Sequence, residues 1–123
     1  MRLPVMAPIG SALIVLALAM VPAAGSVVAQ ERSPTHEGWR QYMVHCARCH
    51  GDDAIGGVMA PDLRASVARG AVDDQSFPTV VLEGRRDQGM PGFKGVLTEA
   101  QVAAIQEYVT ARASGKLKAG RPA

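Results

Sequence analysis

The chain has 123 residues, 13 lysines and arginines against 11 aspartates and glutamates, and a formal net charge of +2 at pH 7. This near balance argues against a nucleic-acid partner, which would require a strongly basic surface. The sequence has two cysteines and no internal repeat, so we predict one small domain. A domain of this size usually needs additional stabilisation from a metal, a disulfide or a cofactor.

The first 29 residues have the pattern of a secretory signal peptide. Arg2 precedes an uncharged apolar stretch from Ala12 to Val21, and small residues follow up to Ala29, where we expect cleavage. The apolar stretch is shorter than the roughly 20 residues that span a bilayer, so no stable membrane span is expected unless this segment is kept as an anchor. We therefore predict export to a bacterial periplasm.

Residues 34–48 have the periodicity of an amphipathic helix. Trp39, Tyr42, Met43 and Cys46 recur at spacings of three and four residues, which places them on one helix face. We expect this face, Met43 included, to pack into the core and to lead directly to the cysteines.

Both cysteines lie in the run Cys-Ala-Arg-Cys-His at positions 46–50, which is typical of covalent attachment of a c-type haem. Cys46 and Cys49 are spaced to add to the two vinyl groups of one porphyrin, and His50 is placed to ligate the iron. A redox dithiol, a small disulfide and half of a zinc site are the alternatives. None of them requires the adjacent histidine, so we expect one haem c bound through Cys46 and Cys49.

Two local patterns follow the motif. The Gly-Asp-Asp triplet at 51–53 is typical of a solvated turn. Residues 77–83 form a short apolar run that stops at Gly84, a residue suited to a left-handed helix C-cap. We expect a helix there, with a strand as the alternative because its two central valines are β-branched.

A sixth iron ligand separates an electron carrier from an open haem that binds small molecules. Met90 lies in the run Gly-Met-Pro-Gly-Phe at 89–93, where proline stiffens the turn and glycine lets the backbone approach the porphyrin. Met59 follows His50 by only nine residues, a short path to the opposite porphyrin face, and is the weaker alternative. We predict Met90 as the second axial ligand beside His50.

Thr98 begins the last predicted helix, because Gln101 three residues later completes a capping-box pattern. Apolar positions continue at helical spacing through Val109, and the helix is expected to end near Ser114. The basic residues 116–123 that follow are predicted to form a disordered tail.

Together these residues resemble the class I c-type cytochromes over most of residues 30–115. Gly38 and Tyr42 stand eight and four residues before Cys46, where that family crosses its first and last helices, and Ile105 and Tyr108 are similar to the partners on the last helix. The resemblance implies an all-α fold, a small cytochrome c domain of about three to five helices packed around one covalently attached haem.

The segment Ala-Pro-Asp-Leu at 60–63 is similar to the family's Gly-Pro-x-Leu segment. There the proline carbonyl accepts a hydrogen bond from the proximal imidazole. The resemblance therefore implies that Pro61 orients His50 and raises its basicity. Alanine stands at position 60 where the family has glycine.

Within the family, the segments 60–64, 80–84 and 89–93 look most like the cytochrome domain of PQQ-dependent quinohaemoprotein alcohol dehydrogenases. Those enzymes oxidise alcohols at pyrroloquinoline quinone and pass single electrons to haem. We expect this chain to be a separate cytochrome without their catalytic domain. Arg64 is a candidate partner of a haem propionate, because a planar guanidinium suits a carboxylate; a solvated arginine is the alternative.

The resemblance implies that the domain at 30–115 carries single electrons and is not itself an enzyme. The expected donor is a periplasmic dehydrogenase, the expected acceptor is a terminal oxidase or another cytochrome, and Arg48, Arg64 and Lys94 are candidate steering charges. Two other functions stay open: a tightly bound haem subunit of an oxidoreductase complex, and an open-iron peroxidase or gas sensor. For the latter, no distal pair of histidine and arginine is visible.

Overall fold

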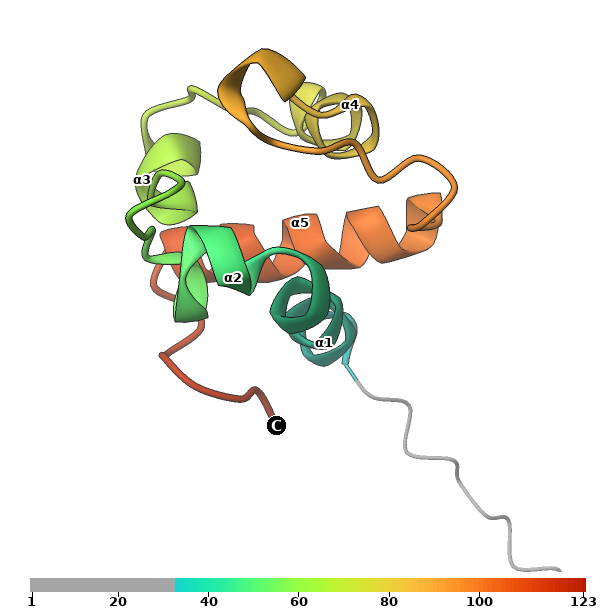
Figure 1. The fold of residues 1–123 in the computed structure, drawn as a ribbon. Helices are drawn as coiled ribbons and strands as arrows, with labels where there is room; N and C mark the ends of the chain where they lie inside the picture. Colours follow the sequence, from blue (N-terminus) through green and yellow to red (C-terminus); the bar gives the residue numbers. More distant parts are fainter. Residues whose placement is uncertain (1–32) are drawn as a thin grey trace, which may run out of the picture.

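The computed structural model describes residues 33–123, so the signal peptide predicted at 1–29 lies outside the described residues. The helical elements are α1 (Pro34–His45), α2 (Ala47–His50), η1 (Asp52–Ala54), α3 (Leu63–Ala68), α4 (Ser76–Glu83), η2 (Arg86–Gln88) and α5 (Glu99–Ala113). This part of the chain has isolated β-bridges but no β-strand. It is therefore all-α, as expected (Figure 1). Among the same residues, no helix has the length and apolar character needed to cross a membrane.

Helices α1 and α5 cross in close contact at the centre of the fold (Figure 1). Gly38 lies at the crossing, where a Cβ atom would collide with the backbone carbonyl of Ala104 in α5. Tyr42 and Tyr108 are fully buried, and their ring centroids lie 5.2 Å apart. A small residue and an aromatic pair thus form the crossing that the family resemblance implied.

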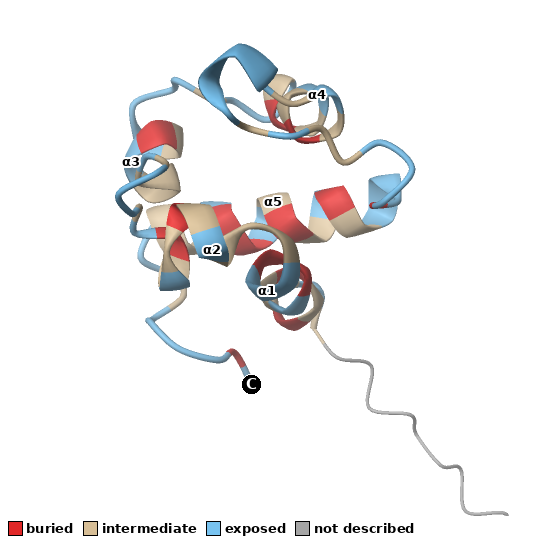
Figure 2. Ribbon diagram, in the orientation of Figure 1, coloured by how far each residue is buried: buried red, intermediate tan, exposed pale blue. Residues whose placement is uncertain are grey.

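The core is built around α5. Buried residues concentrate on α1 and α5 (Figure 2), and α3 and α4 also pack on α5. The buried apolar side chains are Tyr42, Ala54, Phe77, Val81, Leu97, Val102, Ile105, Tyr108 and Val109. Helices α1, α3 and α4 are therefore positioned through their contacts with α5.

The first predicted helix is broken at Cys46. α1 ends at His45, α2 begins at Ala47, and Cys46 has φ −119° and ψ −36°. Its N–H still donates to the Tyr42 carbonyl at 2.8 Å, so the chain bends without losing that hydrogen bond. Met43, expected in the core, is 36% exposed, because the buried face of α1 is the one that contains Gly38 and Tyr42.

The later helices follow local signals in the sequence. α4 confirms the predicted helix at 77–83, and Gly84 ends it with a φ of 78°. α5 begins with the predicted capping box, in which Thr98 and Gln101 each accept a backbone N–H of the other. α3 was not predicted, because six residues are too few to display a helical period; its N-cap is Asp62.

Residues 116–123 differ from the predicted disordered tail, since they run back over the fold. The Gly120 N–H donates to Asp53 Oδ1 at 2.8 Å, and the Arg121 guanidinium lies 5.6 Å from the ring centroid of Trp39. The partners are 67 residues apart for Gly120 and Asp53 and 82 residues apart for Arg121 and Trp39, so no local pattern could reveal them.

Candidate haem site

The two thiols lie where α1 meets α2. Cys46 is the residue between the helices and Cys49 lies within α2; both are half-buried free cysteines. Burial, with a smaller contribution from Cys49, raises the pKa of the Cys46 thiol to about 12. In the absence of an attached group, this thiol is therefore protonated at neutral pH.

His50 is the last residue of α2 and is 9% exposed. Its Nδ1 lies 3.0 Å from the Pro61 carbonyl oxygen. Because a carbonyl oxygen only accepts hydrogen bonds, Nδ1 carries the proton, and the lone pair of the neutral ring is on Nε2. This is the contact that the family resemblance implied for Pro61, and it leaves Nε2 as the nitrogen for a metal.

The first half of the loop between His50 and Pro61 is held by two hydrogen bonds, one at Gly51 and one at Gly56. The Tyr42 hydroxyl donates to the Gly51 carbonyl at 2.6 Å, and the Gly56 N–H donates to the His50 carbonyl at 2.7 Å. The loop therefore joins the histidine to the carbonyl that orients its ring.

Met90 is half-buried in a loop anchored on α4. The Met90 N–H donates to the Arg85 carbonyl at 3.0 Å, and the Arg85 N–H donates to the Met90 carbonyl at 2.9 Å. The N–H groups of residues 93–94 donate to the carbonyls of residues 81–82 in α4. The backbone on both sides of the methionine is thus fixed to the end of one helix.

The two candidate methionines differ in how they are held. Met59 is 79% exposed in the loop before Pro61, whereas Met90 is half-buried and paired through its backbone. Gly84 and Gly92 bring the Met90 loop close to α4, since a Cβ at Gly92 would lie 2.7 Å from the Glu83 carbonyl oxygen. These contacts favour Met90 as the preorganised thioether.

Arg64 is already engaged by Asp62, a partner that sequence reasoning missed. The Arg64 guanidinium lies 2.9 Å from a carboxylate oxygen of Asp62. This side-chain hydrogen bond, assisted by backbone N–H groups at the start of α3, lowers the pKa of Asp62 from its usual value. An aspartate directly before a helix is a typical N-cap residue. This signal could have indicated the start of α3 at Asp62, two residues before Arg64.

The donor set fits a covalently attached haem. Two free thiols three residues apart precede a histidine whose Nε2 is left for a metal. Apolar side chains near this motif are only partly buried against the core, among them Ala47, Leu63 and Phe93. Within residues 33–123, no three His, Cys, Asp or Glu side chains gather as metal ligands, so a zinc site has no donor set there.

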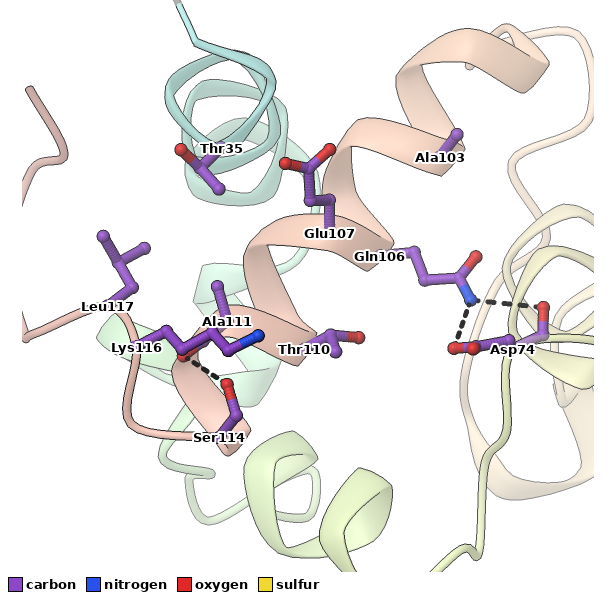
Figure 3. Close-up of a pocket in the computed structure, with 10 residues that line it drawn as sticks. All are labelled: Thr35, Asp74, Ala103, Gln106, Glu107, Thr110, Ala111, Ser114, Lys116 and Leu117. Atoms are coloured by element: carbon purple, nitrogen blue, oxygen red, sulfur yellow. Dashed lines mark hydrogen bonds between the residues drawn. The ribbon is translucent and has the colours of Figure 1, made fainter.

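A hollow on another face of α5 is separate from these residues (Figure 3). It is lined by Gln106, Glu107 and Lys116 among others, and by none of the residues predicted to hold haem. Gln106 points across it and donates to Asp74 at 3.0 Å. The hollow therefore has no part in the site built around Cys46, Cys49 and His50.

Comparison with known proteins finds a cytochrome family and several c-type cytochromes. The family model described as "Cytochrome C oxidase, cbb3-type, subunit III" matches residues 33–109. Cytochrome c55X of Paracoccus denitrificans is 33% identical over 96 residues, which cover 76% of this chain and 91% of that protein.

Quinohemoprotein alcohol dehydrogenase ADH-IIG of Pseudomonas putida is 36% identical over 76 residues, 62% of this chain. The match covers 10% of that enzyme, so the chain spans about a tenth of the length of the quinone-linked dehydrogenases it matches. The crystal structure of the c-type cytochrome XoxG from Methylobacterium extorquens AM1 matches with a TM-score of 0.66 and 29% identity, over 74% of this chain and 57% of that one.

Proposed function

The chain belongs to the cytochrome c family that the cbb3-type subunit III model represents, and we propose that it is a periplasmic carrier of single electrons. Its proposed donor is a quinoprotein dehydrogenase, and its proposed acceptor is a terminal oxidase or another cytochrome. Haem c, bound covalently through Cys46 and Cys49, supplies one-electron chemistry by alternating between ferric and ferrous iron.

The hydrogen bond from His50 Nδ1 to the Pro61 carbonyl is the observation that carries this proposal. It fixes the tautomer, orients the ring and makes Nε2 a stronger donor to iron. We assign His50 as the proximal ligand on this basis, and Met90 as the distal ligand on the basis of its anchored loop. With both positions taken, the protein's side chains favour outer-sphere electron transfer over binding of a substrate at iron.

Export and partner class rest on the sequence and on the relatives. The signal pattern at 1–29 supports a periplasmic location, where disulfide chemistry and haem attachment compete for the two thiols. One relative is named a quinohemoprotein alcohol dehydrogenase. We take from it the class of donor and not the alcohol that it oxidises.

The three cations proposed to steer docking differ in whether they form ion pairs within the protein. Lys94 lies 3.7 Å from Glu83 and Arg64 lies 2.9 Å from Asp62. Arg48, in α2 between the two cysteines, is exposed and forms no ion pair with any residue of the described part of the chain. Arg48 is therefore the charge best suited to attract an acidic partner toward the haem-binding motif.

Stopped-flow mixing with a quinoprotein dehydrogenase from the same cell tests the proposal. We expect rapid reduction of the haem-bound protein, with a rate that falls as ionic strength rises. Arg48→Gln should slow reduction a few-fold at low salt, whereas Lys118→Gln, an exposed charge on the tail, should leave it unchanged. Absence of reduction together with rapid peroxide turnover contradicts the carrier role.

A further inference from the structure

The loop that follows the haem-binding motif contains two residues in an unusual backbone conformation. Asp53 has φ 59° and Ala54 has φ 62°, in the left-handed region that non-glycine residues seldom adopt. Ala54 is fully buried. Surrounding contacts must therefore hold this part of the loop in place.

Arg112 of α5 supplies one such contact. Its side chain is only 7% exposed, and its Nε lies 3.8 Å from Asp53 Oδ1. Nε also donates to the Asp53 backbone carbonyl at 3.3 Å, and a terminal guanidinium nitrogen donates to the Leu117 carbonyl at 2.7 Å. One buried cation thus joins the loop to the chain that follows α5.

The C-terminal tail closes over the same aspartate. The Gly120 N–H donates to Asp53 Oδ1 at 2.8 Å, and the next residue, Arg121, lies over the Trp39 ring of α1. The Asp53 carboxylate therefore has partners from two segments that lie 59 and 67 residues further along the chain.

This arrangement acts on the loop that joins His50 to Pro61. We propose that Asp53 and Arg112, closed over by residues 117–120, are positioning residues that preserve the hydrogen bond between His50 Nδ1 and the Pro61 carbonyl. Asp53 lies three residues after His50, and the Gly56 N–H donates to the His50 carbonyl at 2.7 Å. A loop released at Asp53 is free to shift the carbonyl that orients the imidazole. The inference rests on the proposed ligation by His50 but requires no redox partner.

The test compares Asp53→Asn and Arg112→Lys with the unsubstituted haem-bound protein. Asparagine also tolerates a positive φ and keeps an oxygen for the Gly120 N–H, but it removes the negative charge opposite Arg112. Lysine keeps the positive charge but lacks the planar guanidinium, which donates to the carbonyls of both Asp53 and Leu117. Asp74→Asn is the matched control, since Asp74 also contacts α5, through Gln106, but lies in the segment before α4 and not in the loop.

NMR hydrogen exchange at His50 Nδ1–H and the reduction potential are the two readouts. We expect about tenfold faster exchange in both variants, because the Nδ1–H···O hydrogen bond opens more often. The potential should rise, because a weaker hydrogen bond makes the imidazole a poorer donor to ferric iron. The control should change neither readout.

A purely structural role predicts another pattern. The Gly120 amide would then exchange faster and the protein would melt earlier, while His50 Nδ1–H exchange and the potential stayed unchanged; that result overturns the proposal. Equal effects from Asp74→Asn also overturn it. If Asp53→Asn does not yield folded protein, Arg112→Lys decides the question. Because these measurements use the isolated cytochrome, their failure is distinguishable from a failed electron transfer to or from a partner.

Discussion

At the level of single residues, a methionine decides between an electron carrier and an open iron. Met90 is half-buried, with its backbone paired to Arg85, whereas Met59 is 79% exposed. A methionine whose backbone is already held in place loses less conformational entropy when its sulfur binds iron. The structure therefore favours Met90 on energetic grounds, beyond the composition of its loop.

Substitution of each methionine separates the two candidates. Met90→Ala should abolish the weak near-infrared band that arises from sulfur-to-iron charge transfer, because the axial thioether is lost, and should open the iron to water or imidazole. Met59→Ala is the matched control and should leave the band intact. Near-infrared absorption of the ferric proteins is the measurement. Loss of the band in Met59→Ala alone would show that the sulfur of Met59, and not that of Met90, is the ligand.

The haem-binding motif was predictable because its signal is local: the two cysteines and His50 lie within five consecutive positions. Met90, which stands between glycine and proline, remains a prediction. Arg64 was assigned without its partner, although Asp62 is only two residues away. The pairing of Asp53 with Arg112 joins residues 59 positions apart, and nothing in either local sequence indicates the other. The turn at 51–53 was accordingly expected to be solvated.

At the level of helices, the crossing of α1 and α5 depends on the absence of one methyl group. Gly38 allows α1 to approach the carbonyl of Ala104, and a Cβ there would collide with it. Backbone atoms on the other helix cannot move aside as a flexible side chain would. At position 38, helix propensity therefore favours alanine, whereas the close packing of the two helices requires glycine.

Gly38→Ala measures that opposition. Helix propensity alone would stabilise the protein by about 1 kcal/mol, but we expect the free energy of unfolding to fall by about 1 to 3 kcal/mol because the crossing is overpacked. Ala103→Gly, on the exposed side of α5, measures propensity alone. Denaturant unfolding gives both values, and a more stable Gly38→Ala protein would refute close packing at the crossing.

Helix α3 should be sensitive to acid through its N-cap. The pKa of Asp62 is lowered, chiefly by the side-chain hydrogen bond from Arg64. A carboxyl whose folded pKa lies below its unfolded value stabilises the fold above the unfolded pKa and loses that contribution as the pH falls through the folded pKa. NMR titration of the Asp62 carboxyl should give a midpoint below the ordinary value of about 3.9. Arg64→Gln should raise the midpoint; an unchanged midpoint would contradict the assigned cause.

Helix prediction succeeded where end signals were strong. Thr98 and Gln101 marked the start of α5, and Gly84 marked the end of α4. The break at Cys46 has no proline or glycine to mark it, so the sequence predicted one continuous helix over residues 34–48. α3 is too short for a hydrophobic period to be visible, so only its N-cap could have indicated it.

At the level of the whole molecule, the described chain is small, and we expect its fold to depend on the cofactor. The helices assemble on α5, and apolar side chains such as Leu63, Val67 and Phe93 are only partly buried against the core. A chain of this size buries a limited fraction of its surface on folding. We expect covalent haem to add apolar area and to tie the segment at 46–50 to the rest of the fold.

Removal of both thiols should therefore abolish haem attachment and also destabilise the fold. Cys46→Ala together with Cys49→Ala should abolish haem staining on a denaturing gel. The double variant should also show reduced helical circular dichroism, because the fold loses the stabilisation supplied by the attached haem. Cells competent in cytochrome maturation are the required host. Met59→Ala, expressed in the same cells, should keep both signals. A double variant with wild-type helicity and stability would show that the polypeptide folds without its cofactor.

We propose a covalent haem c with His50 and Met90 as axial ligands. The absorption spectrum of the purified protein, recorded from the visible to the near-infrared in both oxidation states, is the decisive measurement for this ligation. We expect low-spin haem in both states, with the sulfur-to-iron band present in the ferric protein. A high-spin ferric spectrum without that band would rule out Met90 as a ligand and indicate an open iron.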